Sequence, residues 1–199
     1  MTRLIAAGAL AALIAAMVAV AFASLGSDSN GGGSKRQAAG TTTRATVRTQ
    51  PTTTTAPKPA APIKLVAVGP YDPPPGDGTE NDSQVPNAVD GNRATFWSTE
   101  HYTRGFFKRG VGIVLDAGKR RRIARVLVGT DEVGSRAEIQ LADIPTGPYR
   151  IVSPDKPLTE TTAFALKRGA TGRYVLVWLT ALPTATGEGH ITEVRALSR

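Results

Sequence analysis

The densest group of side chains that could bind a ligand lies between residues 100 and 110. This segment reads Glu-His-Tyr-Thr-Arg-Gly-Phe-Phe-Lys-Arg-Gly. Sugar recognition requires aromatic faces for the C–H surface of the ring, and forked hydrogen-bond donors or acceptors for its hydroxyls. Six residues of the segment supply such groups and are the predicted ligand-binding residues: His101, Tyr102, Arg104, Phe106, Phe107 and Arg109.

Other uses of this segment are open at the level of sequence. Phe106 and Phe107, rimmed by basic residues, could press into a lipid surface. Alternatively, Tyr102 and one phenylalanine could complete a core while the rest forms a solvated hairpin. Sugar binding requires Tyr102 and Arg104 to line one concavity, whereas lipid binding requires both phenylalanines to be exposed. Docking onto a protein of the cell envelope would instead require a flat apolar patch.

The motifs of the common enzyme classes do not occur in this sequence. Neither of the two histidines, His101 and His190, lies near a G-x-S-x-G elbow, and there is no H-E-x-x-H, Walker A or G-x-G-x-x-G motif. The chain has no cysteine, which excludes thiolate metal sites and cysteine nucleophiles. We therefore expect a protein without catalytic activity.

The basic charge of the chain is unevenly distributed. The 199 residues carry a net charge of +8, but residues 1–62 hold six basic groups and one acidic group, and residues 63–199 hold 18 and 15. A basic cluster at Lys119–Arg122, with Arg125 beyond it, lies between two predicted strands, so we expect an exposed hairpin tip. Because no aromatic stacking platform accompanies it, nucleic acid is not an expected partner. An anionic wall polymer or lipid surface is the alternative to a purely solubilising turn.

The first 62 residues predict a membrane segment and a linker. From Leu4 to Leu25 no residue is charged, and a helix of that length spans roughly 33 Å, enough for a bilayer core. We predict a single-pass anchor at residues 1–25, with Arg3 on the cytoplasmic side and the C-terminal domain extracellular. A signal peptide cleaved after Ala21-Phe22-Ala23, giving a secreted protein, is the alternative. Residues 26–62 are rich in Thr, Pro and Gly and predict a disordered linker.

Residues 63–199 read as one all-β domain. Strand-like apolar runs recur with turn residues between them, and Tyr174–Leu179 is apolar on both faces, which is typical of a central strand. About eight strands and no long helix predict an antiparallel jelly-roll β-sandwich. The predicted strands are Ile63–Val68, Val111–Leu115, Ile123–Val128, Ala137–Leu141, Tyr149–Val152, Ala163–Leu166, Tyr174–Leu179 and Ile191–Leu197.

One segment of this domain resembles a known family. Residues 87–98 read Asn-Ala-Val-Asp-Gly-Asn-Arg-Ala-Thr-Phe-Trp-Ser, which resembles the A-x-D-G-x-x-x-T-x-W signature of the discoidin, or coagulation-factor type C, superfamily of galactose-binding-like jelly rolls. The runs GVGIVLDAG, IARVLV, RYVLVWLT and ITEVRALS follow in the family's order. Residues 71–81 resemble the subgroup found as the extracellular domain of bacterial membrane-anchored kinases and cell-wall lipid flippase-like proteins.

The resemblance implies a calcium site and a ligand end. In this superfamily the turn at the D-G motif often holds calcium, and Asp90, Asn92, Thr95 and Glu193 would supply its oxygen ligands here. The alternative is that Asp90 and Thr95 only cap a turn while Glu193 pairs with Arg93. Ligands of the superfamily sit on loops at one end of the jelly roll. We therefore expect a membrane-tethered extracellular binding module for a cell-envelope glycan or anionic polymer.

Overall fold

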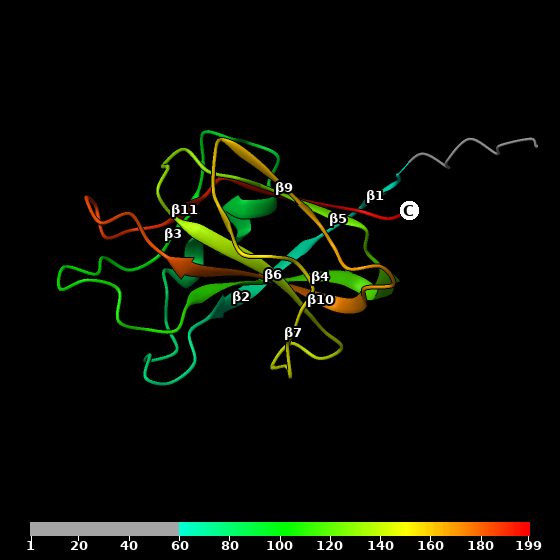
Figure 1. Cartoon of the computed structure of the whole chain (residues 1–199), viewed down its shortest axis with the longest axis horizontal. Coiled ribbons are helices and arrows are strands. Elements are labelled where there is room, and N and C mark those ends of the chain that lie inside the picture. The colour runs from blue at the N-terminus through cyan, green and yellow to red at the C-terminus, as the bar shows by residue number, and fades with distance from the viewer. Residues whose placement is uncertain (1–59) are drawn as a thin grey trace, which may run out of the picture. The chain divides into compact units, whose positions relative to one another are not determined.

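The computed structural model describes residues 60–199, which contain twelve strands and one short 3-10 helix (Figure 1). The predicted membrane anchor, residues 1–25, lies outside the described residues, as does the predicted linker up to residue 59. Within residues 60–199, no helix is both long enough and apolar enough to cross a membrane.

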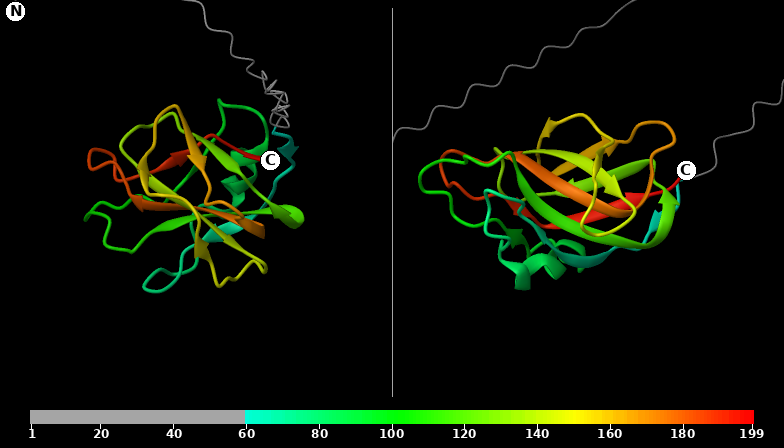
Figure 2. Two further views of the ribbon diagram at one scale, coloured as in Figure 1. Left: turned by 45° about the vertical axis from the view of Figure 1, so that its right-hand side comes forward. Right: turned by 90° about the horizontal axis from the view of Figure 1, so that it is seen from below.

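Two antiparallel sheets pack face to face to form the sandwich (Figure 2). The helix η1 (Asp82–Val89) packs against β2 (Val66–Tyr71). Strand β8 (Lys156–Pro157) pairs with β6 (Arg136–Ala142) in the larger of the two sheets. The smaller sheet has the order β1 (Pro62–Ile63), β12 (Glu193–Leu197), β5 (Arg125–Gly129) and β9 (Thr161–Ala165). The larger sheet has the order β2 (Val66–Tyr71), β4 (Val111–Arg122), β10 (Thr171–Ala181), β6 (Arg136–Ala142) and β7 (Arg150–Ile151), and a separate pair joins β3 (Trp97–Ser98) and β11 (His190–Ile191).

Strand β10 shows why its sequence is apolar on both faces. It lies between β4 and β6, and its alternate residues Val175, Val177 and Leu179 point into the main core between the sheets. The other alternate set, Tyr174, Leu176 and Trp178, forms a second buried cluster on the outer face of the larger sheet. Successive side chains of a strand point to opposite faces, so a strand buried on both sides must be apolar throughout.

The predicted all-β architecture is confirmed, and each of the eight predicted runs overlaps a strand, but three corrections are needed. The runs Ile63–Val68 and Ile191–Leu197 each divide between two strands of different sheets, β1 with β2 and β11 with β12. Lys119–Arg122 is not a hairpin tip but the last part of β4, which continues to pair with β10 as Arg121 opposite Gly172 and Arg122 opposite Thr171. A register shift between Gly172 and Tyr174 lets this pairing resume beyond the apolar core. Exposed charged side chains therefore do not end the strand, because its backbone groups still have partners.

One group of loops lies at the opposite end of the sandwich from β1 and the C-terminus (Figures 1 and 2). We call the segments 72–80, 99–110, 130–135 and 182–190 the loop end. The opposite end holds β1, the end of β4, the turn between β9 and β10, and the C-terminus. Antiparallel strands alternate in direction, so the segment before β4 and the segment after β10 both fall at the loop end.

Candidate functional site

A buried ionic network anchors the 99–110 loop. The Lys108 ammonium donates to Asp72 Oδ1 at 2.7 Å and to Glu80 Oε1 at 3.2 Å, and all three side chains are at most 6% exposed. Glu80 also accepts hydrogen bonds from the Tyr102 hydroxyl and, at 2.5 Å, from the backbone N–H of Glu100. The network thus ties three points of the loop to the segment that precedes η1.

Burial and hydrogen bonding set the charge states in this network. Burial disfavours the charge on Lys108, but hydrogen bonds with Asp72, Tyr102 and Glu80 outweigh it and raise the pKa of the ammonium. Burial and the hydrogen bond to Glu80 together raise the pKa of the Tyr102 hydroxyl. Burial and repulsion from Glu80 raise the pKa of Glu100. At neutral pH Lys108 is therefore a cation and Tyr102 a neutral hydrogen-bond donor.

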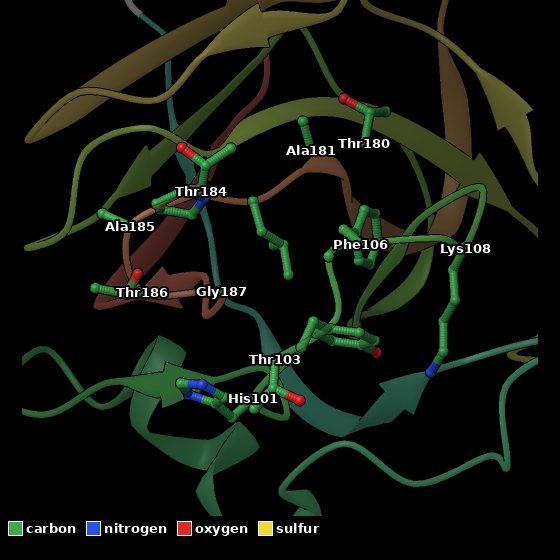
Figure 3. A pocket seen from close by; sticks show the side chains of 14 residues that line it. His101, Thr103, Phe106, Lys108, Thr180, Ala181, Thr184, Ala185, Thr186 and Gly187 are labelled. Atoms are coloured by element: carbon green, nitrogen blue, oxygen red, sulfur yellow. The ribbon is translucent and has the colours of Figure 1, made fainter.

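The first of two pockets at this end lies between the 99–110 loop and the segment 180–187 (Figure 3). Its volume is about 410 Å³, within the size range of small-molecule sites. His101, Thr103 and Phe106 line one wall, and Thr184 and Thr186 stand on the wall opposite. The pocket thus combines an aromatic ring with hydroxyl and imidazole groups that can bond to sugar hydroxyls.

A second pocket lies on the other side of Tyr102. Its volume is about 310 Å³, and it is enclosed by the segment 75–77 and by the 99–110 loop. Tyr102 and Arg104 both line this pocket, which is the arrangement that sugar binding requires. Because Tyr102 and Lys108 line both pockets, the buried network forms the partition between them.

The remaining predicted ligand residues differ in their surroundings. Phe106 is half-buried and packs against the core, with its ring perpendicular to that of Tyr102 at a centroid distance of 5.1 Å. Phe107 is 71% exposed and lines the second pocket, whereas Arg109 is exposed and lines neither pocket. The lipid-binding alternative required two exposed phenylalanines, but only Phe107 is exposed.

The second wall of the first pocket, the segment 180–187, contains none of the predicted ligand-binding residues. This wall is held in place by histidine–carboxylate contacts: Glu188 lies 2.9 Å from His101 Nδ1 and 3.8 Å from His190 Nε2. His190 in turn contacts Asp131 at 3.0 Å and Glu132 at 3.5 Å. The turn-forming run Pro-Thr-Ala-Thr-Gly-Glu-Gly at residues 183–189 was a signal for a loop, and strand direction places that loop beside the segment 99–110.

The predicted calcium residues come together at one turn and the first residue of β12. Asp90 accepts hydrogen bonds from Asn92 N–H and from the Thr95 hydroxyl, each at 2.7 Å. Glu193 is 7% exposed, and its Oε2 has no hydrogen-bond partner among the described residues. Burial raises the pKa of Glu193, and the charge of Asp90 adds to this effect.

These residues fit a hard cation that takes oxygen ligands. A buried carboxylate oxygen without a partner needs compensation, and calcium accepts carboxylate, carbonyl and hydroxyl oxygens together. No group of three or more His, Asp or Glu side chains within residues 60–199 is arranged to hold a metal, so amide, hydroxyl and backbone oxygens would have to complete the shell. The alternative is confirmed in one part: Asp90 and Thr95 cap the turn through their hydrogen bonds to each other and to Asn92. Among residues 60–199 Glu193 forms no ion pair with Arg93, which contacts Glu160 at 3.4 Å instead.

Comparison with known proteins identifies the fold. No family model matches the sequence. A solved structure of truncated AlyQ, with CBM32 and alginate lyase domains, has a TM-score of 0.54 and 21% identity over 70% of this chain and 34% of that chain, so this chain spans about a third of its length. The family 32 CBM from C. perfringens NanJ in complex with galactose has a TM-score of 0.52 and 16% identity, over 70% of this chain and 99% of that chain. CBM32-3 from a family 31 glycoside hydrolase from Clostridium perfringens has a TM-score of 0.53 and 15% identity, over 70% of this chain and 95% of that chain.

Residues 60–199 therefore have the galactose-binding-like β-sandwich fold of family 32 carbohydrate-binding modules. This agrees with the fold implied by the Asp90-Gly91 to Trp97 signature. Trp97 is fully buried and donates its indole N–H to the Glu80 carbonyl at 2.7 Å, so the signature tryptophan belongs to the core.

Proposed function

We propose that the domain is a non-catalytic module that binds a cell-envelope glycan in the two pockets of its loop end. The observation that carries the proposal is the pair of adjoining pockets on either side of Tyr102, lined by aromatic rings, hydroxyls, His101 and Arg104. Two neighbouring concavities of 410 and 310 Å³ suit two successive units of a sugar chain better than one isolated small molecule.

The charge of the loop end favours an uncharged sugar chain. Its segments hold seven acidic residues against three basic ones, with both histidines taken as neutral. Lys108, Asp72 and Glu80 are buried and paired with one another, which leaves five acidic residues against Arg104 and Arg109. An anionic polymer would meet repulsion here, whereas hydroxyl groups can bond to carboxylates as well as to threonines. The acidic residues are Asp72, Asp77, Glu80, Glu100, Asp131, Glu132 and Glu188.

Preorganised loops support the same proposal. The ionic network fixes the 99–110 loop, and the contact between His101 and Glu188 joins it to the opposite wall. A site held in its binding shape before the ligand arrives loses less conformational entropy on binding. A lipid-surface role is less favoured because Phe106 packs into the core, and a protein-docking role because the surface is hollowed.

The proposal also includes calcium and tethering. Asp90, Asn92, Thr95 and Glu193 would hold the calcium ion, which would neutralise the buried Glu193 and stiffen the turn after η1. The apolar segment at residues 1–25 would anchor the protein in the cell membrane, and the linker would hold the module outside it. We also propose that the domain is related to the extracellular domains of bacterial membrane-anchored kinases and cell-wall lipid flippase-like proteins, on the basis of residues 71–81.

Binding of the full chain to isolated cell wall and to an array of neutral glycans tests the proposal. Arg104→Ala/Phe107→Ala removes two exposed groups from the second pocket and is expected to weaken retention at least tenfold. Arg150→Ala/Ile151→Ala removes the same two kinds of exposed side chain from β7 and is expected to retain binding. Absence of retention of the parent chain on wall and on every glycan would overturn the proposal, as would equal losses in both variants.

A further inference from the structure

The end of the sandwich opposite the pockets gathers exposed cations from three separate segments. Sequence alone identified only the cluster in β4 and Arg125. The fold places the turn between β9 and β10, and also Arg199, beside the β4 cluster. We call the resulting surface the basic end. Its exposed basic residues are Lys119, Arg120, Arg121, Arg122, Arg125, Lys167, Arg168 and Arg199.

Backbone hydrogen bonds fix the frame of this surface. Ile123 N–H donates to the Ala170 carbonyl at 3.1 Å, and Leu166 N–H donates to the Ala124 carbonyl at 2.9 Å. Ala124 N–H in turn donates to the Leu197 carbonyl at 2.8 Å. The corner between β4 and β5 is therefore held to both the 166–170 turn and the end of β12, so the backbone positions that carry these cations are fixed relative to one another.

A small cleft lies at the centre of the basic end. Its volume is about 30 Å³, and its charged lining consists of Arg122, Lys167, Arg168 and Arg199, with no acidic side chain. The Arg122 guanidinium reaches over Gly169, where an added Cβ would lie 3.8 Å from Nη2. A cleft of this volume holds about one water-sized group, so it can receive the oxygens of an anion but not a sugar ring.

Apart from Arg120, which pairs with Asp143, the positive charge of this surface lacks a partner carboxylate within residues 60–199. Across residues 60–199, Arg122, Arg125, Lys167 and Arg168 form no ion pair with a carboxylate. The nearby acids are already engaged, Asp116 by Arg173 at 2.7 Å and Asp143 by Arg120. Like charges held together without counter-charges cost free energy in the folded protein, and an anionic ligand relieves that cost.

We propose that the basic end is a second binding site, for a linear polymer that carries phosphate groups. Four cations surround the cleft, and Arg120 lies on the same face of β4 as Arg122, so the surface is longer than one phosphate and suits a chain of them. None of the residues that line the cleft is an exposed large apolar side chain, which disfavours insertion into a lipid bilayer. The site is independent of the glycan pockets at the loop end.

Binding of the full chain to inorganic polyphosphate tests the proposal. If four cations contact phosphates, affinity is expected to fall about 50-fold between 50 and 200 mM NaCl. Arg122→Ser/Arg168→Ser is expected to weaken polyphosphate binding at least tenfold and to leave retention on neutral glycans unchanged. The matched control Arg104→Ser/Arg109→Ser removes two exposed arginines from the other end and is expected to bind polyphosphate as the parent does.

Three results would overturn the proposal. Equal losses in the two double variants would mean that only net charge matters. Tighter binding to phosphatidylglycerol–phosphatidylcholine vesicles than to polyphosphate, lost in Arg122→Ser/Arg168→Ser, would identify a membrane-binding surface instead. Absence of polyphosphate binding to the parent chain at 50 mM NaCl would mean that the basic end takes no phosphate polymer. Because the glycan assay uses neither this probe nor these residues, failure of one proposal leaves the other standing.

Discussion

Replacing Lys108 by methionine is expected to destabilise the domain by about 3–5 kcal/mol, because it leaves two buried carboxylates without their cation. Asp72 and Glu80 have fully buried side chains and lie 2.7 and 3.2 Å from the Lys108 ammonium. For a domain of this size 1 kcal/mol changes the melting temperature by about 3 °C, so we expect a decrease of about 10–15 °C. Urea unfolding and thermal melting at pH 7 measure both quantities.

The pH dependence distinguishes charge burial from lost packing. In Lys108→Met the unpaired carboxylates favour proton uptake in the folded state, so the variant's deficit should shrink as the pH falls from 7 towards 4.5. Lys119→Met, at an exposed lysine, is the control and should stay within about 0.5 kcal/mol of the parent. A deficit below 1 kcal/mol, or one that is the same at both pH values, would refute the reasoning.

Three other substitutions test separate parts of the structure. Burial raises the pKa of Glu193, so without calcium the parent should lose stability as the pH rises above the usual glutamate range. Thermal melting with chelator should show this loss in the parent but not in Glu193→Gln. Added calcium should stabilise only the parent. Gly112→Ala should destabilise the domain by about 1–3 kcal/mol in urea, because a Cβ would lie 2.0 Å from the Val177 carbonyl oxygen, and an unchanged midpoint would contradict this. Trp97→Phe should cost about 1–3 kcal/mol by leaving the buried Glu80 carbonyl unpaired, and a melt identical to the parent's would show that water replaces the indole.

The strands of this domain were predictable because burial dictates their composition. Residues 174–179 are apolar at every position, and only a strand covered on both faces requires that. In β9 the exposed and buried residues alternate, which is the pattern of a strand with one solvated face. The two-residue strands β3 and β8 were missed, and β1 and β11 were merged with the strands that follow them, since two residues carry no periodicity.

The buried ionic network could not be predicted from the sequence. Asp72, Glu80 and Lys108 lie in two loop-like stretches that look like ordinary solvated surface, and charged residues are seldom fully buried. Nothing in local composition shows that Lys108 meets two carboxylates, since the partners are 28 and 36 residues away. The sequence did identify Tyr102, but not that its hydroxyl is committed to Glu80.

The near balance of charge in residues 63–199 concealed a polarity that the fold makes visible. An excess of only three positive charges over these residues suggests a surface without electrostatic preference. The fold instead places eight exposed cations at one end, where Asp116 and Asp143 are already paired, and at the other end five acidic residues besides the buried Asp72 and Glu80. The Debye length at physiological ionic strength is about 8 Å, so each end presents its own field to a ligand and the average has no physical meaning for binding. Partner chemistry therefore has to be argued for each end separately: hydroxyl-rich and uncharged at the pockets, anionic at the basic end.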